Sequence, residues 1–373
     1  MSTGPQSTTP ATSFPAWQPV LEWAASRGAS VQLTVVHRGQ VVFDGASGCT
    51  PDALGWLFSA SKPFTSLLVH RLAGRGVLDL DCAVSAYWPA YGTGGRGSKS
   101  GTTLRDVLTH RTAVPTAGPY PAAVLTMHRA GPSAQRVARG RRRGRRYAGV
   151  SAYQPLDSGF ILGEVARRAT VRDAEGLGEG LGEGREEGWA ELLRREVLDP
   201  AGLDDVHPGV PDAQLHRCLP LDGSWRAGPG GPVVAAVLNR RAVRQARIPA
   251  AGISTTARQL ARFYAELLHA PERAALCAPS SEGGRDAWTR LPTRWGTGVQ
   301  LGGTGEACPF GTTSTERTFG HNGSDVCLGW ADPDLDLAVG MVTDRASGHP
   351  ADRRLMVQVS DLVRATALSH GGG

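Results

Sequence analysis

Residues 57–64 read Leu-Phe-Ser-Ala-Ser-Lys-Pro-Phe and lead into an apolar helix predicted over about 63–73. Residues three apart share one face of a helix, so the hydroxyl of Ser59 and the amine of Lys62 can meet there. A serine hydroxyl becomes a strong nucleophile when a neighbouring base takes its proton. A lysine can be that base only when burial or nearby positive charge depresses its pKa. The segment therefore predicts a nucleophile and its base at the start of a buried helix.

The chain carries its positive charge almost entirely on arginine. Lysine and arginine together number 40, and Lys62 and Lys99 are the two lysines. Arginine cannot release its proton in a protein, whereas lysine can. The lysine at position 62 thus indicates a titratable amine, with an ordinary helix-start lysine as the alternative. Lys99 lies in a Gly- and Ser-rich segment, and we expect it to be a solvated surface residue.

Composition and charge describe a globular chain with a sizeable core. Of the 373 residues, 40% are hydrophobic and 20% are charged. The excess positive charge is concentrated in the run 139–146, which argues against a nucleic-acid partner. The six cysteines form no Cys-x-x-Cys pair, so we expect no metal, no cofactor and free thiols in a reducing compartment.

The N-terminal segment bears on where in the cell the protein is expected. Residues 1–15 are rich in Ser, Thr and Pro and are expected to form a disordered tail. This segment lacks the basic start and apolar centre of a secretory signal, and no run approaches the ~18 apolar residues of a membrane span. These features favour a cytoplasmic protein with no membrane partner.

Hydrophobic patterns place strands near both ends of the chain and helices between them. The predicted strands are 31–37, 41–43, 296–302, 329–331 and 335–342. The predicted helices are 17–25, 63–73, 104–109, 151–169, 189–197, 257–268 and 353–368. We predict an α+β fold in which one antiparallel sheet carries the terminal helices. In a single domain spanning 16–373, residues 16–80 and 250–373 would form the α/β part and 81–249 the helical part.

Three segments lack clear patterns. Residues 116–150 show little apolar periodicity and are expected to form a loop or partly disordered surface outside the core. Residues 175–188 alternate Glu and Gly, which is typical of a flexible insert. Residues 200–250 are rich in Pro and Gly and predict no definite element.

Three short motifs occur in order along the chain. They are Ser59-Ala-Ser-Lys62, Tyr153-Gln-Pro155 and His321-Asn-Gly323. With their flanking residues they resemble the class C β-lactamase-like serine hydrolases, which include esterases and acyltransferases. The resemblance covers about 30–365 and fades in 116–148, 172–188 and 205–248. It implies a β-lactamase/transpeptidase-like fold.

This resemblance implies catalytic roles for three side chains. Ser59 is the expected nucleophile, and Lys62 shares its proton. Tyr153 resembles the tyrosine of the family's Tyr-x-Asn motif, whose phenolate or phenol relays the proton. A tyrosine acts as a base near neutral pH only beside positive charge, which Lys62 would supply. Tyr147 is a rival candidate, and a core or loop tyrosine is the alternative without a function.

The third motif is expected to line the substrate site. His321, Asn322 and Gly323 resemble the family's Lys-Thr-Gly strand motif in the His-x-Gly form of its esterases. The alternative is a histidine beside an Asn-Gly hairpin turn.

The resemblance also implies an oxyanion hole. It would use the backbone N–H of Ser59 and that of a residue after Gly323, either Asp325 or Val326.

Two departures from the family pattern bear on the substrate. Pro155 replaces the amide side chain of penicillin-recognising members, and His321 replaces a lysine that helps hold a substrate carboxylate. Both favour an ester, thioester or small amide over a β-lactam or peptidoglycan. The resemblance therefore implies a serine hydrolase with an acyl-Ser59 intermediate. An acyltransferase using an alcohol or amine acceptor, and a ligand-binding protein without activity, are the alternatives.

Overall fold

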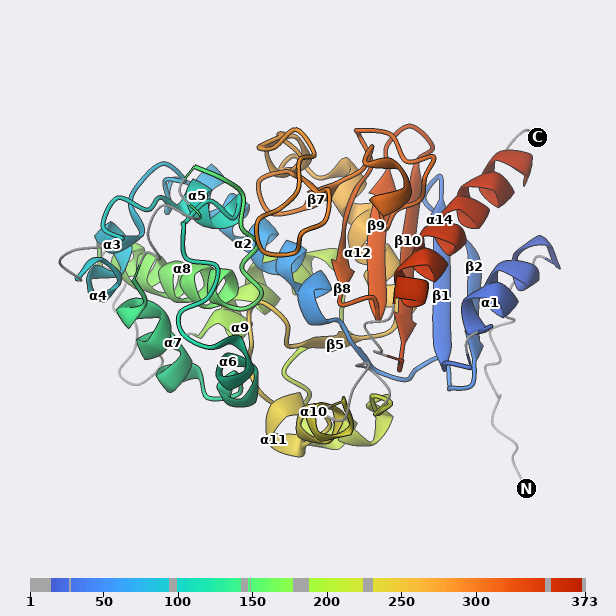
Figure 1. Ribbon diagram of the computed structural model, residues 1–373, viewed down its shortest axis with the longest axis horizontal. Coiled ribbons are helices and arrows are strands. Elements are labelled where there is room, and N and C mark those ends of the chain that lie inside the picture. Colours follow the sequence, from blue (N-terminus) through green and yellow to red (C-terminus); the bar gives the residue numbers. More distant parts are fainter. Residues whose placement is uncertain are drawn as a thin grey trace, which may run out of the picture.

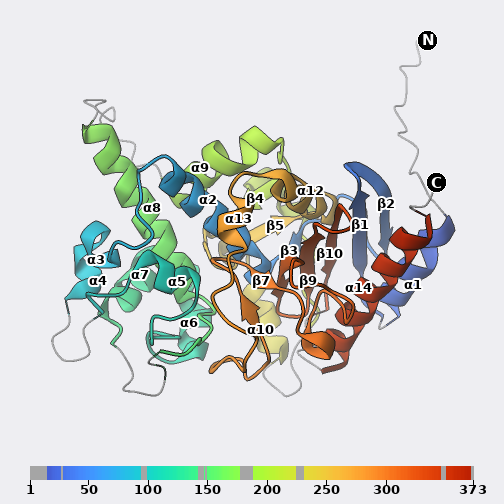
Figure 2. The same cartoon turned by 90° about the horizontal axis from the view of Figure 1, so that it is seen from above.

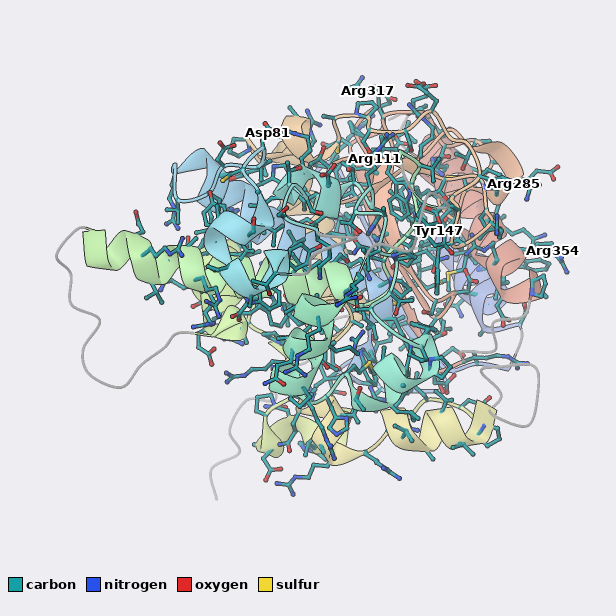
Figure 3. The ribbon with its side chains drawn as sticks, turned by 60° about the vertical axis from the view of Figure 1, so that its left-hand side comes forward. Asp81, Arg111, Tyr147, Arg285, Arg317 and Arg354 are labelled. Atoms are coloured by element: carbon teal, nitrogen blue, oxygen red, sulfur yellow. The ribbon has the colours of Figure 1, made fainter. Side chains whose placement is uncertain are left out.

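The computed structural model describes residues 15–26, 28–93, 99–141, 147, 149–176, 188–223, 231–345 and 350–370. The expected tail up to residue 14, the insert over 177–187 and the arginines over 142–146 lie outside this set. Within the described ranges, no helix is both long and apolar enough to cross a bilayer. Exposed basic side chains such as Arg285, Arg317 and Arg354 lie at the periphery of the molecule (Figure 3).

The described part of the chain contains a seven-stranded antiparallel sheet, at the right of Figure 1. Its strands follow the order β2 (Gln40–Ser47), β1 (Val31–His37), β10 (Leu337–Thr343), β9 (Cys327–Asp332), β8 (Phe319–Gly323), β7 (Gln300–Leu301) and β6 (Arg294–Trp295). Early and late strands meet near its centre, where Val35 of β1 pairs with Val339 of β10. The predicted sharing of one sheet by the two ends of the chain is confirmed.

Helices cover both faces of this sheet (Figures 1 and 2). The terminal helices α1 (Gln18–Ala25) and α14 (Pro350–His370) cover one face and α12 (Ala257–His269) the other. Because side chains alternate along a strand, Leu33 packs with the terminal helices while Val36 joins the cluster that includes α12. Gly340 lets α12 approach β10, since a Cβ there would lie 2.3 Å from the carbonyl oxygen of Ala257.

A second group of elements lies beside the sheet, most of them at the left and bottom of Figure 1. Its helices are α2 (Lys62–Gly74), α3 (Val84–Tyr87), α4 (Pro89–Gly92), α5 (Leu104–Leu108), α6 (Tyr120–Thr126), α7 (Ala130–Arg139), α8 (Asp157–Gly176), α9 (Trp189–Leu193), α10 (Gly231–Leu238), α11 (Arg241–Arg244) and α13 (Arg273–Leu276). A small sheet of β3 (Gly55–Trp56), β5 (Ile253–Thr255) and β4 (Val206–Pro208) lies between this group and the large sheet.

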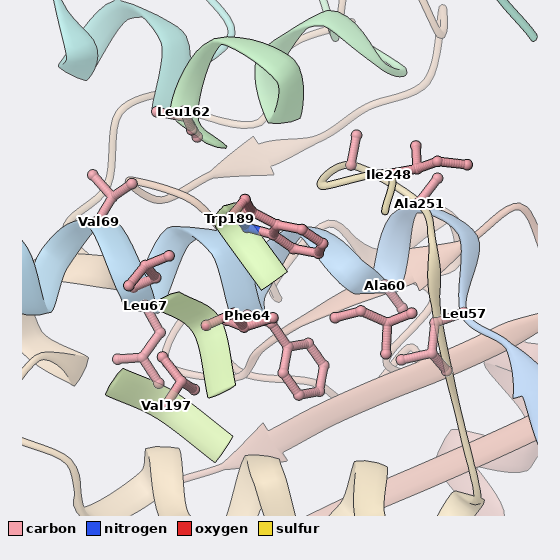
Figure 4. Packing of buried hydrophobic residues seen from close by; sticks show 14 of the residues in the cluster. Leu57, Ala60, Phe64, Leu67, Val69, Leu162, Trp189, Val197, Ile248 and Ala251 are labelled. Atoms are coloured by element: carbon pink, nitrogen blue, oxygen red, sulfur yellow. The ribbon is translucent and has the colours of Figure 1, made fainter. Parts of the chain in front are cut away.

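Helix α2 is buried around most of its circumference, as its dense apolar sequence predicts. Figure 4 shows Phe64 and Leu67 of α2 packed close to Trp189 and Val197 of the helical group. Phe64 also stacks on Phe263 of α12, with ring centroids 3.7 Å apart. Packing against both the helical group and α12 therefore fixes the helix that begins at the Ser-x-x-Lys segment.

The prediction that residues 116–150 form a surface loop is wrong for most of the segment. This region contains α6 and α7, and Ala123, Met127 and Val137 are buried in the main hydrophobic cluster. Its apolar residues are few and interrupted by Gly131 and Pro132, so the helical period is weak in the sequence. Tertiary packing stabilises these short helices.

The prediction for Lys99 is also wrong. Its side chain is buried, with Nζ donating to the carbonyl oxygens of Val137 (2.6 Å) and Ala138 (3.0 Å). Nζ also lies 3.9 Å from the centroid of the Tyr91 ring. Burial lowers the pKa of Lys99 to about 8. This lysine links the segment at 99 to α7 instead of facing solvent.

Candidate active site

Ser59 lies in a 3₁₀ turn over Phe58–Ser61 that leads directly into α2. Phe58 precedes it with φ +46°, a left-handed conformation that is strained for a bulky residue. The Phe58 ring stacks on Trp56 at 5.3 Å, and the N–H of Leu57 donates to Ile253 of β5 at 2.9 Å. These contacts hold the sharp turn that brings Ser59 to the start of α2.

Lys62 is buried beneath the Ser59 hydroxyl, with 6% of its surface exposed. Its Nζ lies 3.2 Å from Ser59 Oγ, 2.7 Å from the carbonyl oxygen of Pro155 and 3.2 Å from that of Ala250. Burial lowers the pKa of Lys62 to about 7. A neutral amine has two N–H donors, which the two carbonyls can accept, and this leaves its lone pair for the proton of Ser59.

Tyr153 contacts the same hydroxyl from another side. Its O–H donates to Ser59 Oγ at 2.6 Å, and its ring stacks on Trp295 at 5.4 Å with 2° between the planes. The edge of His110 lies against this ring at 4.8 Å. Burial raises the pKa of Tyr153 above its usual value near 10, so the tyrosine keeps its proton at neutral pH. Of the two forms that the resemblance allows, phenolate and phenol, this burial favours the phenol.

Asp286, which the sequence analysis did not single out, holds the backbone of Tyr153 in place. Both of its carboxylate oxygens accept from the Tyr153 N–H, at 3.1 and 2.9 Å, and one accepts from Ser151 Oγ at 2.9 Å. Asp286 itself is buried. It lies far from Tyr153 in the sequence and belongs to none of the three motifs, so only the structure reveals it. The rival Tyr147 packs in a separate small cluster with Ala113.

The third motif lies on β8, near Tyr153. His321 is buried, and its ring centroid is 6.2 Å from that of Tyr153. Its Nδ1 lies 2.8 Å from the carbonyl oxygen of Asn322, which assigns the proton to Nδ1 and leaves Nε2 as an acceptor. Burial lowers the pKa of His321 to about 3, so the ring is neutral. It cannot supply the positive charge of the lysine that it replaces.

The turn after β8 corrects the expected second oxyanion donor. The N–H of Asp325 donates to Asn322 Oδ1 at 2.8 Å, and the N–H of Val326 donates to the carbonyl of Gly323 at 3.0 Å. Both N–H groups are therefore already used within the turn. Ser324 has φ +57° and lines the same cavity as Ser59, and its N–H has no partner within the described residues.

Gly323 permits the backbone at Leu57 to lie close to β8. A Cβ at Gly323 would lie 2.1 Å from the carbonyl oxygen of Leu57 and 2.3 Å from Sγ of Cys327. The neighbour that approaches Gly323 is therefore the backbone that leads to Ser59.

Comparisons with known proteins agree with this geometry. The family model described as Beta-lactamase matches residues 22–362. The chain is 28% identical over 354 residues to "Esterase/beta-lactamase LipL" of Mycobacterium tuberculosis, covering 84% of this chain and 76% of LipL. Two solved structures share the fold. EstA from Arthrobacter nitroguajacolicus Rue61a has a TM-score of 0.74 at 24% identity, covering 95% of this chain and 97% of EstA. EstCE1, described as a hydrolase with promiscuous acyltransferase activity, has a TM-score of 0.70 at 18% identity, covering 94% and 97%.

The family match spans most of the chain and includes all three motifs. The chain therefore belongs to the beta-lactamase family and is a serine hydrolase.

Proposed function

We propose that the protein is an esterase that works through an acyl-Ser59 intermediate. The observation that carries this proposal is the position of Ser59 Oγ between two groups of different proton affinity. Lys62 Nζ, with a pKa of about 7, lies 3.2 Å away, and the protonated Tyr153 O–H lies 2.6 Å away. A base and an acid on one nucleophile are what acyl transfer needs.

The proposed acylation begins with neutral Lys62. Its lone pair takes the proton from Ser59 Oγ as that oxygen forms a bond to the ester carbonyl carbon. The carbonyl oxygen becomes an oxyanion, which the N–H groups of Ser59 and Ser324 would stabilise. As the ester C–O bond breaks, the leaving oxygen takes the proton of Tyr153. The proton on Lys62 then returns to the Tyr153 oxygen, which restores both groups.

Deacylation would use the same residues with water as the nucleophile. Water attacks the acyl carbon and gives its proton to Lys62, and Lys62 passes that proton to Ser59 Oγ as the bond between this oxygen and the acyl carbon breaks. The product is a carboxylic acid. His321 takes no part as a charge in this scheme because it is neutral. The substrate classes we propose are esters, thioesters and small amides. A carboxylated β-lactam is disfavoured because the side chain at position 321 carries no positive charge to bind its carboxylate.

Acyl transfer is the second proposal. The same acyl-enzyme can react with an alcohol or amine, and EstCE1, which has a similar fold, is described as having promiscuous acyltransferase activity. Adding an alcohol acceptor and measuring the new ester against the free acid distinguishes transfer from hydrolysis.

Intact-protein mass spectrometry tests the proposal directly. Incubation with p-nitrophenyl esters and acyl-thioesters should add one acyl mass to the wild type, and a fluorophosphonate should label it. Ser59→Ala should show neither the acyl adduct nor the fluorophosphonate label, and it should show no turnover. Ser61→Ala, which removes a hydroxyl one residue before Lys62, serves as the matched control. A ligand-binding protein without activity would give no adduct with any of these reagents, and turnover by Ser59→Ala would overturn the nucleophile assignment.

A further inference from the structure

A cavity of about 510 Å³ opens beside Ser59. One main wall is formed by α6 together with Met127, the residue that follows it, and the other is formed by α10. The two helices lie next to each other in Figures 1 and 2. The apolar side chains of these walls are Val124, Leu125, Met127, Val233, Val234 and Leu238. Both walls come from segments where the sequence resemblance to the family fades, 116–148 and 205–248.

The cavity is apolar, with few polar groups. Asp325 is the charged side chain among the described residues that line it, and no Lys, Arg or His is among them. The Asp325 carboxylate is itself paired with Arg353 at 3.2 Å and bonded to the side chain of Asn322. An anionic group in the cavity would therefore lose its hydration without gaining a counter-ion, which excludes acidic substituents.

The position of Tyr153 indicates which part of an ester enters the cavity. In the proposed mechanism the leaving oxygen must lie within reach of the Tyr153 O–H, on the side of Ser59 that carries Trp295. Tyr153 and Trp295 do not line the cavity, whereas Pro155 and Ala251 do. If the alcohol leaves toward Tyr153, the cavity, which neither ring lines, is the space available to the acyl group.

Two side chains at the cavity are unusually exposed for their type. Leu125 of α6 is 47% exposed and Val233 of α10 is 61% exposed. Exposed apolar surface is unfavourable in water, and both residues would bury part of this surface against an apolar ligand.

We infer that the preferred substrates are esters of neutral, apolar acyl groups of medium length, well beyond acetyl, since a cavity of this volume falls in the range that accepts small apolar ligands. This inference rests on the proposed acyl-Ser59 function and specifies its substrate class. Each methylene buried in the cavity should raise kcat/KM by about fourfold until the cavity is filled.

The test uses two matched series of esters. In the first series, p-nitrophenyl esters from acetate to dodecanoate vary the acyl chain with a constant leaving group. We expect kcat/KM to rise with acyl length and to be at least about tenfold higher for octanoate than for acetate. In the second series, acetates of alcohols of increasing length should give no comparable rise.

Variants on one helix locate the effect. Val234→Phe fills the cavity and should lower the octanoate-to-acetate ratio of kcat/KM by at least about tenfold. Ala236→Phe introduces the same ring on the exposed side of α10, away from the cavity, and should leave that ratio unchanged.

The outcomes separate this inference from the function on which it rests. Acetylation of Ser59 with no dependence on acyl length would overturn the inference and leave the esterase proposal standing. A preference that follows the alcohol chain would also overturn it, because the cavity would then hold the leaving group. No adduct on Ser59 with any ester would instead refute the proposed function.

Discussion

Lys62 Nζ lies 3.2 Å from Ser59 Oγ, and its other two neighbours are carbonyl oxygens of Pro155 and Ala250. Both carbonyls accept hydrogen bonds whether the amine is charged or neutral. Burial decides the protonation state, because it lowers the pKa of Lys62 to about 7. A group with this pKa can act as a base at neutral pH, and an arginine in the same place could not.

The first prediction is the pH dependence of acylation. Lys62 is neutral above its pKa of about 7, so kcat/KM for a neutral ester should rise as pH increases through about 7. Tyr153 keeps its proton because burial raises its pKa, so the rate should then stay level to about pH 9. Steady-state kinetics between pH 5 and pH 9 measure the profile.

Two arginine variants provide the control. Lys62→Arg keeps the charge but cannot release the proton, and it should reduce acylation by more than about 100-fold at every pH. Lys99→Arg makes the same change at the other buried lysine and should retain the rise near pH 7. A flat wild-type profile, or wild-type turnover by Lys62→Arg, would remove this lysine from the mechanism.

The second prediction concerns the acid that protonates the leaving group. Tyr153→Phe removes the O–H that lies 2.6 Å from Ser59 Oγ and should slow acylation by about 10²- to 10⁴-fold. The loss should be larger for an alkyl ester than for a p-nitrophenyl ester, because p-nitrophenolate leaves without a proton. Tyr147→Phe is the matched control and should retain activity. Equal losses for both leaving groups would exclude Tyr153 as the acid.

The third prediction treats Asp286 as a positioning residue. Asp286→Asn replaces one of the two carboxylate oxygens, which accept from the Tyr153 N–H, with an NH₂ group. Because two donors would then face each other, the variant should displace Tyr153. We expect kcat to fall by at least about tenfold while KM changes little, because substrate binding does not involve this carboxylate.

Double variants distinguish positioning from a general structural defect. Adding Asp286→Asn to Tyr153→Phe should cost little further activity if Asp286 acts through the tyrosine. Ser151→Ala removes only one hydrogen bond to the same carboxylate and should have a smaller effect. Fully additive losses in the double variant would contradict the positioning role.

Local spacing made much of the site predictable. Ser59 and Lys62 are three residues apart, and the helix that follows is apolar enough to be recognised from the sequence. The antiparallel sheet was predictable because its long strands β1, β2 and β10 are rich in β-branched and apolar residues. Tyr153 was found only by resemblance, because no local pattern sets it apart from Tyr147.

The errors arose where distant segments meet and, in one case, from the detailed geometry of a tight turn. Lys99 reads as a surface residue because its carbonyl partners, on α7, lie about 40 residues away in the chain. The oxyanion donor was misplaced because the Asn322 side chain accepts from the N–H of Asp325, a detail of turn geometry. Asp286 lies 133 residues from Tyr153 and carries no motif that could have marked it.

The last prediction is that Lys62 makes stability depend on pH. Its folded-state pKa of about 7 is below the usual value of 10.5, so between these values the unfolded chain binds more protons than the folded one. The free energy of unfolding of the wild type, minus that of Lys62→Met, should therefore increase by about 1.4 kcal/mol per pH unit from about pH 7 upward. Below about pH 7 the difference should be constant, because the amine is protonated in both states.

Urea unfolding from pH 6 to pH 9.5 measures this difference, and the second lysine supplies a matched comparison. Lys99 has a pKa of about 8, so the corresponding rise for Lys99→Met should begin about one pH unit higher. The comparison cancels the titrating groups that do not interact with the replaced amine, since each variant differs from the wild type at one side chain. A difference that does not change with pH for Lys62→Met would mean that the amine is charged in the folded protein at neutral pH, and it could then not act as the base for Ser59.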